Sequence, residues 1–171
     1  MDSIINQMCS NAIALFNNDK VQGTVKFHQC RGETETRVTI DLRGLTPYVT
    51  RAIHIHEYGD ESEGCKSLGG HWNPTGETHG TWEIEGMPTH AGDMINNINP
   101  DGRGRFFACY DDPRIQIRGD ERSSIVGRSV VIHDGEDDLG LGGNVDSLKT
   151  GNAGSRMACA IIGHARQITI I

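Results

Sequence analysis

The sequence predicts an all-β protein, folded as a sandwich or a barrel. Short runs of alternating or β-rich character recur at regular spacing, and no segment carries a helical stripe of apolar residues over three turns. The predicted strands cover residues 11–16, 21–29, 35–42, 51–58, 104–110, 114–118, 129–133 and 157–163. Many short strands at this spacing are typical of sandwiches and barrels.

Turn signals separate the first four predicted strands. They are Asn17-Asn18-Asp19, Arg31-Gly32 and Gly44-Leu45-Thr46-Pro47. Two long polar, glycine-rich stretches follow, at 59–101 and 134–155. Structureless loops of this length are uncommon in a compact domain and usually carry function, and both of these flank histidines.

Length and composition indicate one domain spanning 1–171, because no linker or internal repeat divides the 171 residues. Aromatic residues make up only 5%, so the core must rest on Val, Ile, Leu and Ala. The formal net charge of −7 argues against nucleic acid and anionic membrane surfaces as partners. An anionic substrate would need a local positive charge to draw it in.

No apolar run approaches the roughly 18–20 residues of a membrane span. The first 16 residues carry Asp2 but no Lys or Arg, so a secretory signal is not indicated and a cytoplasmic location is expected. No two cysteines have the CxxC spacing of a thiolate zinc site. In a reducing compartment Cys9, Cys30 and Cys109 are expected to be free thiols.

Histidines concentrate around the first long loop. His54 and His56 lie two apart in a predicted strand and therefore point to the same face, as a chelating pair must, although such a pair alone also fits a solvent-facing surface. His133 ends another predicted strand and is a candidate further ligand for that site.

The loop itself adds three more imidazoles and a carboxylate. His71, His79, His90 and Asp93 make a closed tetrahedral set suited to zinc. A loop with so few apolar residues cannot order itself by burial, so metal binding is expected to supply the ordering energy.

The chain resembles the copper/zinc superoxide dismutases in an ordered series of motifs that runs from about Ala12 to Ala165. The matching motifs are Ile53-His54-Ile55-His56-Glu57-Tyr58-Gly59-Asp60, Gly64-Cys65, Gly70-His71-Trp72-Asn73-Pro74, His90-Ala91-Gly92-Asp93, Val131-Ile132-His133, Asp137-Asp138-Leu139-Gly140 and Gly151-Asn152-Ala153-Gly154-Ser155-Arg156. The resemblance implies an eight-stranded antiparallel Greek-key β-barrel, a flattened sandwich with two long functional loops.

The resemblance also implies two metal sites that share His71. Copper would be held by His54, His56, His71 and His133, and zinc by His71, His79, His90 and Asp93. Imidazole ligands suit both metals. Asp137 would lie behind the ligands and join His54 to His79.

The implied activity is dismutation of superoxide to dioxygen and hydrogen peroxide. Copper would alternate between Cu(II) and Cu(I), zinc would hold the geometry, and His71 would leave copper on reduction and carry a proton to the second superoxide. Arg156 would supply the positive charge that attracts and orients the anion, with Lys149 assisting in steering.

The family resemblance further implies a disulfide between Cys65 and Cys159 and a homodimer, with a copper chaperone as a possible partner. His164 stands at a normally apolar interface position, and extensions at 1–10 and 167–171 flank the domain, so altered pairing is an alternative. The loop sequence Val145-Asp146 departs from the two acids usual in the family, and a lysine common near Gly135 is absent.

Two other functions compete with an active dismutase. A non-enzymatic relative that binds zinc or a chaperone would typically lack copper ligands or the arginine, and all of these are present here. A zinc hydrolase built on His54, His56 and His133 would need a general base, for which the sequence offers no obvious candidate.

Overall fold

The computed structural model describes residues 9–166. Most of the expected N-terminal extension (1–8) and all of the C-terminal one (167–171) lie outside the described residues. Among those described, no helix has the length and apolar character that crossing a bilayer requires.

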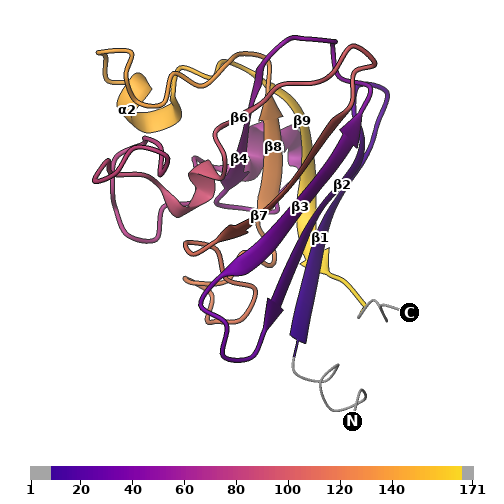
Figure 1. The fold of residues 1–171 in the computed structure, drawn as a ribbon, viewed down its shortest axis with the longest axis vertical. Helices are drawn as coiled ribbons and strands as arrows, with labels where there is room; N and C mark the ends of the chain where they lie inside the picture. Colours follow the sequence, from indigo (N-terminus) through magenta and orange to yellow (C-terminus); the bar gives the residue numbers. More distant parts are fainter. Residues whose placement is uncertain (1–8, 167–171) are drawn as a thin grey trace.

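Eight antiparallel strands form one sheet in the order β6-β4-β8-β9-β1-β2-β3-β7. The sheet curls into a nearly closed barrel (Figure 1). The antiparallel pair β8 and β9 lies between β4 and β1, so the order of strands in space differs from their order along the chain. The predicted all-β fold is confirmed. The strands of the sheet are β1 (Cys9–Asn17), β2 (Gln22–Cys30), β3 (Thr36–Arg43), β4 (Arg51–His56), β6 (Asn97–Ile98), β7 (Phe106–Asp112), β8 (Ser129–His133) and β9 (Arg156–His164).

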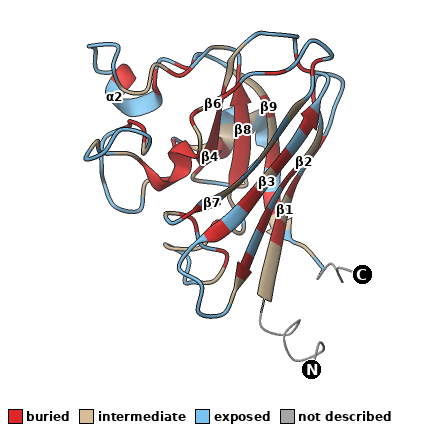
Figure 2. Ribbon diagram, in the orientation of Figure 1, coloured by how far each residue is buried: buried red, intermediate tan, exposed pale blue. Residues whose placement is uncertain are grey.

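Alternating burial along β1, β2 and β3 shows why these segments form strands. In β1, Ala12, Ala14 and Phe16 point into the core while the residues between them point outward. The core is mainly aliphatic, as the low aromatic content predicted, with Phe16, Phe27 and Trp72 as its aromatic members. β4 and β8 differ, because nearly all of their residues are buried (Figure 2). Their second face is therefore covered by other parts of the chain.

The two long loops provide that cover, and both lie on the same side of the barrel (Figure 1). The first contains β5 (Ser62–Cys65), η1 (Lys66–Leu68) and η2 (Ala91–Asp93), and the second contains the short helix α2 (Ser147–Thr150). The His79 N–H donates to the Leu148 carbonyl at 2.9 Å, which joins the loops to each other. Four residues are too few to show a helical stripe, which is why α2 was not predicted.

The prediction of a strand at 114–118 is wrong. Ile115 and Ile117 are buried, which produces the alternating pattern, but Gln116 makes only an isolated bridge with Ser124. Side chains, in place of a neighbouring strand, form hydrogen bonds with the backbone of Ile115 and Ile117. Thr36 Oγ1 donates to the Ile115 carbonyl at 2.6 Å, and Gln29 Oε1 accepts the Ile117 N–H at 3.0 Å.

Two disulfides cross-link the described residues. The implied bridge between Cys65 and Cys159 is present and ties β5 to β9. A second bridge joins Cys9 to Cys30, so the expectation of free thiols is wrong for this pair. The two residues are direct partners in the β1–β2 ladder, which brings their side chains together. Cys109 is free and exposed.

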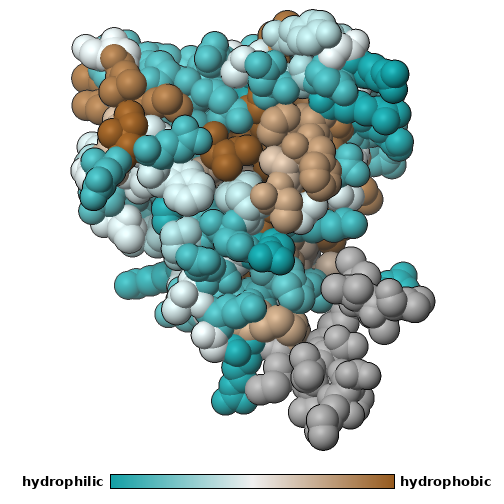
Figure 3. Space-filling view, viewed as in Figure 1, coloured by the Kyte–Doolittle hydropathy of each residue, from teal (hydrophilic) through white to brown (hydrophobic). Residues whose placement is uncertain are grey.

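The surface is mainly hydrophilic on the face shown in Figure 3. Apolar side chains gather at its upper left, over α2 and the loop that carries it. The exposed apolar residues of that loop are Leu141, Val145 and Leu148.

Candidate metal centre

Two groups of buried side chains bring potential metal ligands together, and they share His71. Within each group, the ligand atoms all lie within 4.8 Å of one another. The first group is His54, His56, His71 and His133, and the second is His71, His79, His90 and Asp93. These are the two sets that the resemblance implies.

Strand geometry positions the first group. Because side chains alternate along β4, Ile53 and Ile55 face the core and leave His54 and His56 on the opposite face. His71 is placed against β4 by its bridge to His56 and by the Trp72 N–H, which donates to the Ile55 carbonyl at 2.8 Å.

The hydrogen bonds of the first group leave unprotonated nitrogens facing one another. His56 Nδ1 donates to the Gly69 carbonyl at 3.1 Å and His133 Nδ1 to the Gly154 carbonyl at 3.3 Å. Each Nε2 then carries a lone pair, and the two Nε2 atoms lie only 3.2 Å apart. Two lone pairs this close repel, and a cation that both can coordinate removes the conflict.

The other two imidazoles complete this pattern. His54 Nε2 donates to Asp137 Oδ2 at 2.7 Å, which leaves His54 Nδ1 with a lone pair. His54 Nδ1 and His71 Nε2 are both buried without a hydrogen-bond partner. Such unpaired buried nitrogens are costly in an ordinary core and are expected of metal ligands.

Electrostatics keep this group neutral, as ligation requires. Burial, reinforced by the neighbouring His71, lowers the pKa of His54 to about 3. Burial likewise lowers the pKa of His133 to about 4 and holds the pKa of His56 well below its ordinary value. Burial also lowers the pKa of His71, so the group presents four neutral imidazole nitrogens at physiological pH.

The second group converges on one carboxylate oxygen. The Nδ1 atoms of His71 and His79 lie 2.9 Å from Asp93 Oδ1, and His90 Nδ1 lies 3.1 Å from it. These separations approach the roughly 3.3 Å between two ligands that are held about 2.0 Å from zinc at tetrahedral angles. Three nitrogens and one oxygen thus fit a closed zinc site.

Local turns hold Asp93 in place. Its Oδ2 accepts the His90 N–H at 2.8 Å and the Thr89 hydroxyl at 3.0 Å, so the carboxylate caps the helix η2 in which it lies. Burial opposes ionisation of Asp93, but hydrogen bonds from the three histidines outweigh it and hold its pKa far below the ordinary value. Asp93 is therefore an anionic ligand.

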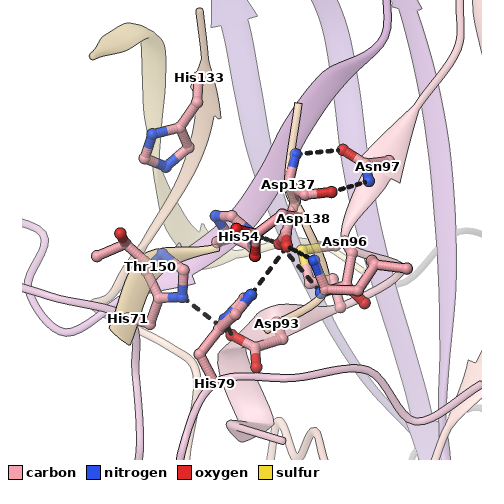
Figure 4. A network of polar contacts seen from close by, with 12 residues as sticks. His54, His71, His79, Asp93, Asn96, Asn97, His133, Asp137, Asp138 and Thr150 are labelled. Carbon is pink, nitrogen blue, oxygen red and sulfur yellow. Dashed lines mark hydrogen bonds and ion pairs between the residues drawn. The ribbon is translucent and has the colours of Figure 1, made fainter. Parts of the chain in front are cut away.

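Asp137 joins the two groups from behind, and Figure 4 shows the His54 and His79 side chains reaching toward its carboxylate. Asp137 Oδ2 accepts from His54 and Oδ1 accepts from His79 Nε2 at 2.9 Å. Burial lowers the pKa of His79, but Asp137 and Asp93 together outweigh it and raise this pKa to about 9. The predicted link between His54 and His79 has the expected geometry.

Two asparagines that the sequence analysis missed hold Asp137. Asn96 Nδ2 donates to Asp137 Oδ2 at 3.0 Å, and the Asn97 side chain accepts the Asp137 N–H at 2.9 Å (Figure 4). Asn96 has a positive φ of 56°. An Asn-Asn pair immediately after a metal-ligand loop was the available signal, since asparagine tolerates this conformation.

Arg156 lies beside the first group. It is the ladder partner of His133 at the start of β9, and its guanidinium donates to the Cys65 carbonyl at 2.6 Å and to the Gly69 carbonyl. The Gly69 carbonyl also accepts from His56, so one backbone group positions both side chains. Lys149 is exposed on α2, and its role in steering stays a prediction.

The donor chemistry therefore fits copper in the first group and zinc in the second. Four neutral imidazoles suit copper, whereas a tetrahedral set of three imidazoles and one carboxylate suits zinc. A barrel that carries both, joined through one histidine, defines a class of two-metal β-barrel protein.

Comparisons with known proteins agree with this class. The family model for copper/zinc superoxide dismutase (SODC) matches residues 21–162. The superoxide dismutase [Cu-Zn] of Cordyceps militaris is 45% identical over 90% of this chain and 97% of its own. That of Yarrowia lipolytica is 46% identical over 89% and 96%. The crystal structure of the clock protein EA4 superposes with a TM-score of 0.83 at 35% identity, covering 92% of this chain and 96% of that one.

The chain belongs to the copper/zinc superoxide dismutase family. Its cofactors are copper and zinc, and the family's activity makes it an oxidoreductase.

Proposed function

We propose that this centre dismutates superoxide and that the residues named above have the roles that the family resemblance implies. Two superoxide anions and two protons give dioxygen and hydrogen peroxide. Bound copper supplies one-electron exchange between Cu(II) and Cu(I), beside a zinc ion that has no redox chemistry. The observation that carries the proposal is the convergence of four unprotonated, buried imidazole nitrogens beside an arginine.

Arg156 is the group that we expect to bind the anion. The loop that carries Cys65 fixes the guanidinium, because the carbonyls of Cys65, Lys66 and Gly69 accept its N–H groups. A guanidinium has five N–H donors in all. Donors that face away from the loop can bind superoxide. The chain has a net charge of −7, so this local cation offsets the general repulsion of an anion.

His71 is the residue that we expect to deliver a proton. Its Nδ1 faces Asp93 at 2.9 Å, while its Nε2 is buried and has no protein partner. A proton held at Nε2 therefore has no acceptor in the protein and can pass to a reduced substrate.

The proposal is tested on protein loaded with both metals. We expect about one copper and one zinc per chain by elemental analysis, together with catalytic loss of superoxide after pulse radiolysis. Protein that binds zinc but no copper, or that is inert when fully loaded, would identify it as a non-enzymatic relative.

Substitution of Arg156 tests its role separately from metal binding. We expect Arg156→Ala to lower the rate at low ionic strength by about tenfold and to weaken its salt dependence, with metal content unchanged. Arg103→Ala, which removes an exposed arginine from another loop, is the matched control. Equal rates for the two variants would remove Arg156 from the mechanism.

We also propose that the chain forms a homodimer. Tyr58 is 56% exposed and Ile161 is 42% exposed. Gly59, which follows Tyr58, packs against the Ile161 side chain and the Gly127 backbone, so these residues form one surface. This small apolar surface suits a second copy. Sedimentation equilibrium should show a dimer for the parent and a monomer for Ile161→Glu; a monomeric parent would contradict the proposal.

A further inference from the structure

A third group of potential metal ligands lies outside the centre described above. It consists of Cys9, His28 and Cys30, whose ligand atoms all lie within 4.8 Å of one another. Cys9 begins β1 and Cys30 ends β2, at the lower end of the barrel in Figure 1, whereas α2 lies at the upper left.

Strand register places this group on the outer face of the barrel. Cys9 pairs with Cys30, and Asn11 pairs with His28. Gln29, between His28 and Cys30, and Ala12, next to Asn11, point inward and are buried. Side chains two apart share a face, so Cys9, His28 and Cys30 lie together with Asn11 where solutes can reach them.

His28 is oriented as a ligand. Its Nδ1 donates to Asn11 Oδ1 at 2.7 Å, which leaves the lone pair on Nε2. Nε2 lies 3.3 Å from Cys30 Sγ and thus faces the sulfur pair. Metal-binding histidines characteristically donate their other ring N–H to a fixed acceptor in this way, which sets the tautomer.

The surroundings favour a cation. His28 lines an open cavity of about 340 Å³ together with Glu33, Glu35 and the ion-paired Arg37 and Asp111. The Glu33 carboxylate accepts the Cys30 N–H at 2.6 Å, so an acidic group is held beside the cysteine. The cavity gives an ion or a small chelator access to the imidazole.

In the structure the two sulfurs are joined as a disulfide, so ligation requires reduction. A dithiol reductant supplies two electrons and two protons, breaks the S–S bond and leaves two thiols while it is oxidised to its own disulfide. Each thiol loses its proton when it binds a metal. Oxidation by hydrogen peroxide reverses the change, because two thiols and one peroxide give a disulfide and two waters.

We propose that Cys9, Cys30 and His28, once the disulfide is reduced, bind one Cu(I) ion. Two thiolates and one imidazole are soft donors of the kind that selects Cu(I). Zinc prefers four ligands, and this group offers only three among the described residues. The disulfide therefore acts as the closed state of a redox-gated copper site.

The test uses the copper- and zinc-loaded protein carrying Cys109→Ser, which removes the exposed free thiol. After anaerobic reduction, Cu(I) is titrated against a chromophoric Cu(I) chelator. We expect one additional Cu(I) per chain in the reduced protein and none in the oxidised protein. The Cys9→Ser/Cys30→Ser variant retains Cys65 and Cys159 and should bind no additional ion.

Two variants that keep the disulfide test the geometry. Asn11→Ala removes the acceptor that fixes the tautomer of His28, so the affinity for the additional Cu(I) should fall about tenfold. His28→Ala removes the ligand itself and should lower this affinity further. Dismutation should be unchanged in both, because neither residue belongs to the centre. Three results would overturn the proposal. The Cys9→Ser/Cys30→Ser variant could bind the same additional copper, the reduced parent could bind no additional copper, or the site could bind Zn(II) as tightly as Cu(I).

Discussion

Asp137 connects the two ligand groups of the metal centre by hydrogen bonds to a histidine of each. Its two oxygens accept from His54, His79 and Asn96, and Oδ1 also accepts the Leu139 N–H at 2.7 Å. Each oxygen thus receives two donors. A carboxylate is needed here, because a carboxamide would turn an N–H₂ group toward one of these donors.

We therefore expect Asp137→Asn to weaken metal binding about 10- to 100-fold without unfolding the protein. Chelator competition for zinc and for copper measures the effect. Glu136→Gln removes the charge of the exposed neighbouring residue and serves as the control. Equal affinities in the two variants would mean that Asp137 does not orient the ligands.

Gly151 is required by close packing as well as by conformation. Its φ is +62°, and a methyl group there would overlap the Asp137 carboxylate and come within 2.6 Å of His79 Nε2. Gly143 has a similar φ of +72° but has no atom near its missing side chain. The two glycines separate conformational strain from steric conflict.

The variants Gly143→Ala and Gly151→Ala compare the cost of backbone strain alone with the cost of strain and steric overlap together. We expect Gly143→Ala to cost about 1 kcal/mol through strain alone. Gly151→Ala should cost more and should also lower zinc content, since Asp137 and His79 must move. Thermal unfolding and elemental analysis measure both effects, and indistinguishable variants would contradict the packing argument.

The ligands could be predicted from the sequence because their types and spacing follow local rules. His54 and His56 share a strand face, and four ligands crowd one loop. The Asn-Asn pair marks the position of Asn96 but not its role, because its partner Asp137 lies 41 residues away in the chain. The bond between Cys9 and Cys30 was missed for a similar reason, since it follows from strand register.

At the scale of elements, the segment 114–118 shows how side chains can replace a strand partner. Gln29 points inward from β2, and its Oε1 accepts the N–H groups of Ile117 and Arg118 at 3.0 and 3.4 Å. Burial alternates as in a strand, so the hydrophobic pattern alone cannot tell the two apart.

Gln29→Ala should therefore leave the buried Ile117 N–H unpaired and reduce the free energy of unfolding by about 1–3 kcal/mol. Gln22→Ala is the control, because Gln22 lies in the same strand but is exposed. Chemical denaturation of the metal-loaded proteins compares them. Similar midpoints for both variants would show that water satisfies the Ile117 N–H instead.

At the scale of the whole molecule, the disulfide between Cys65 and Cys159 closes 94 positions of chain and fastens the first long loop to β9. The Cys65 carbonyl also accepts from Arg156. The bridge thus connects the stability of the barrel with the position of the anion-binding arginine.

We expect Cys65→Ser/Cys159→Ser to lose about 4–5 kcal/mol of unfolding free energy by the chain-entropy model. Cys109→Ser, which removes a free thiol, should lose little. Denaturation under non-reducing conditions measures both. A loss below 1 kcal/mol for the double variant would show that the loop is held by its other contacts.

His71 belongs to both ligand groups, and this sharing has a thermodynamic consequence. An ion in one group fixes the ring for the other, so the two affinities cannot be independent. Linkage requires reciprocity: whatever factor zinc applies to the affinity for copper, copper applies to the affinity for zinc. The order in which the metals are loaded therefore changes each apparent affinity but leaves the total binding free energy the same.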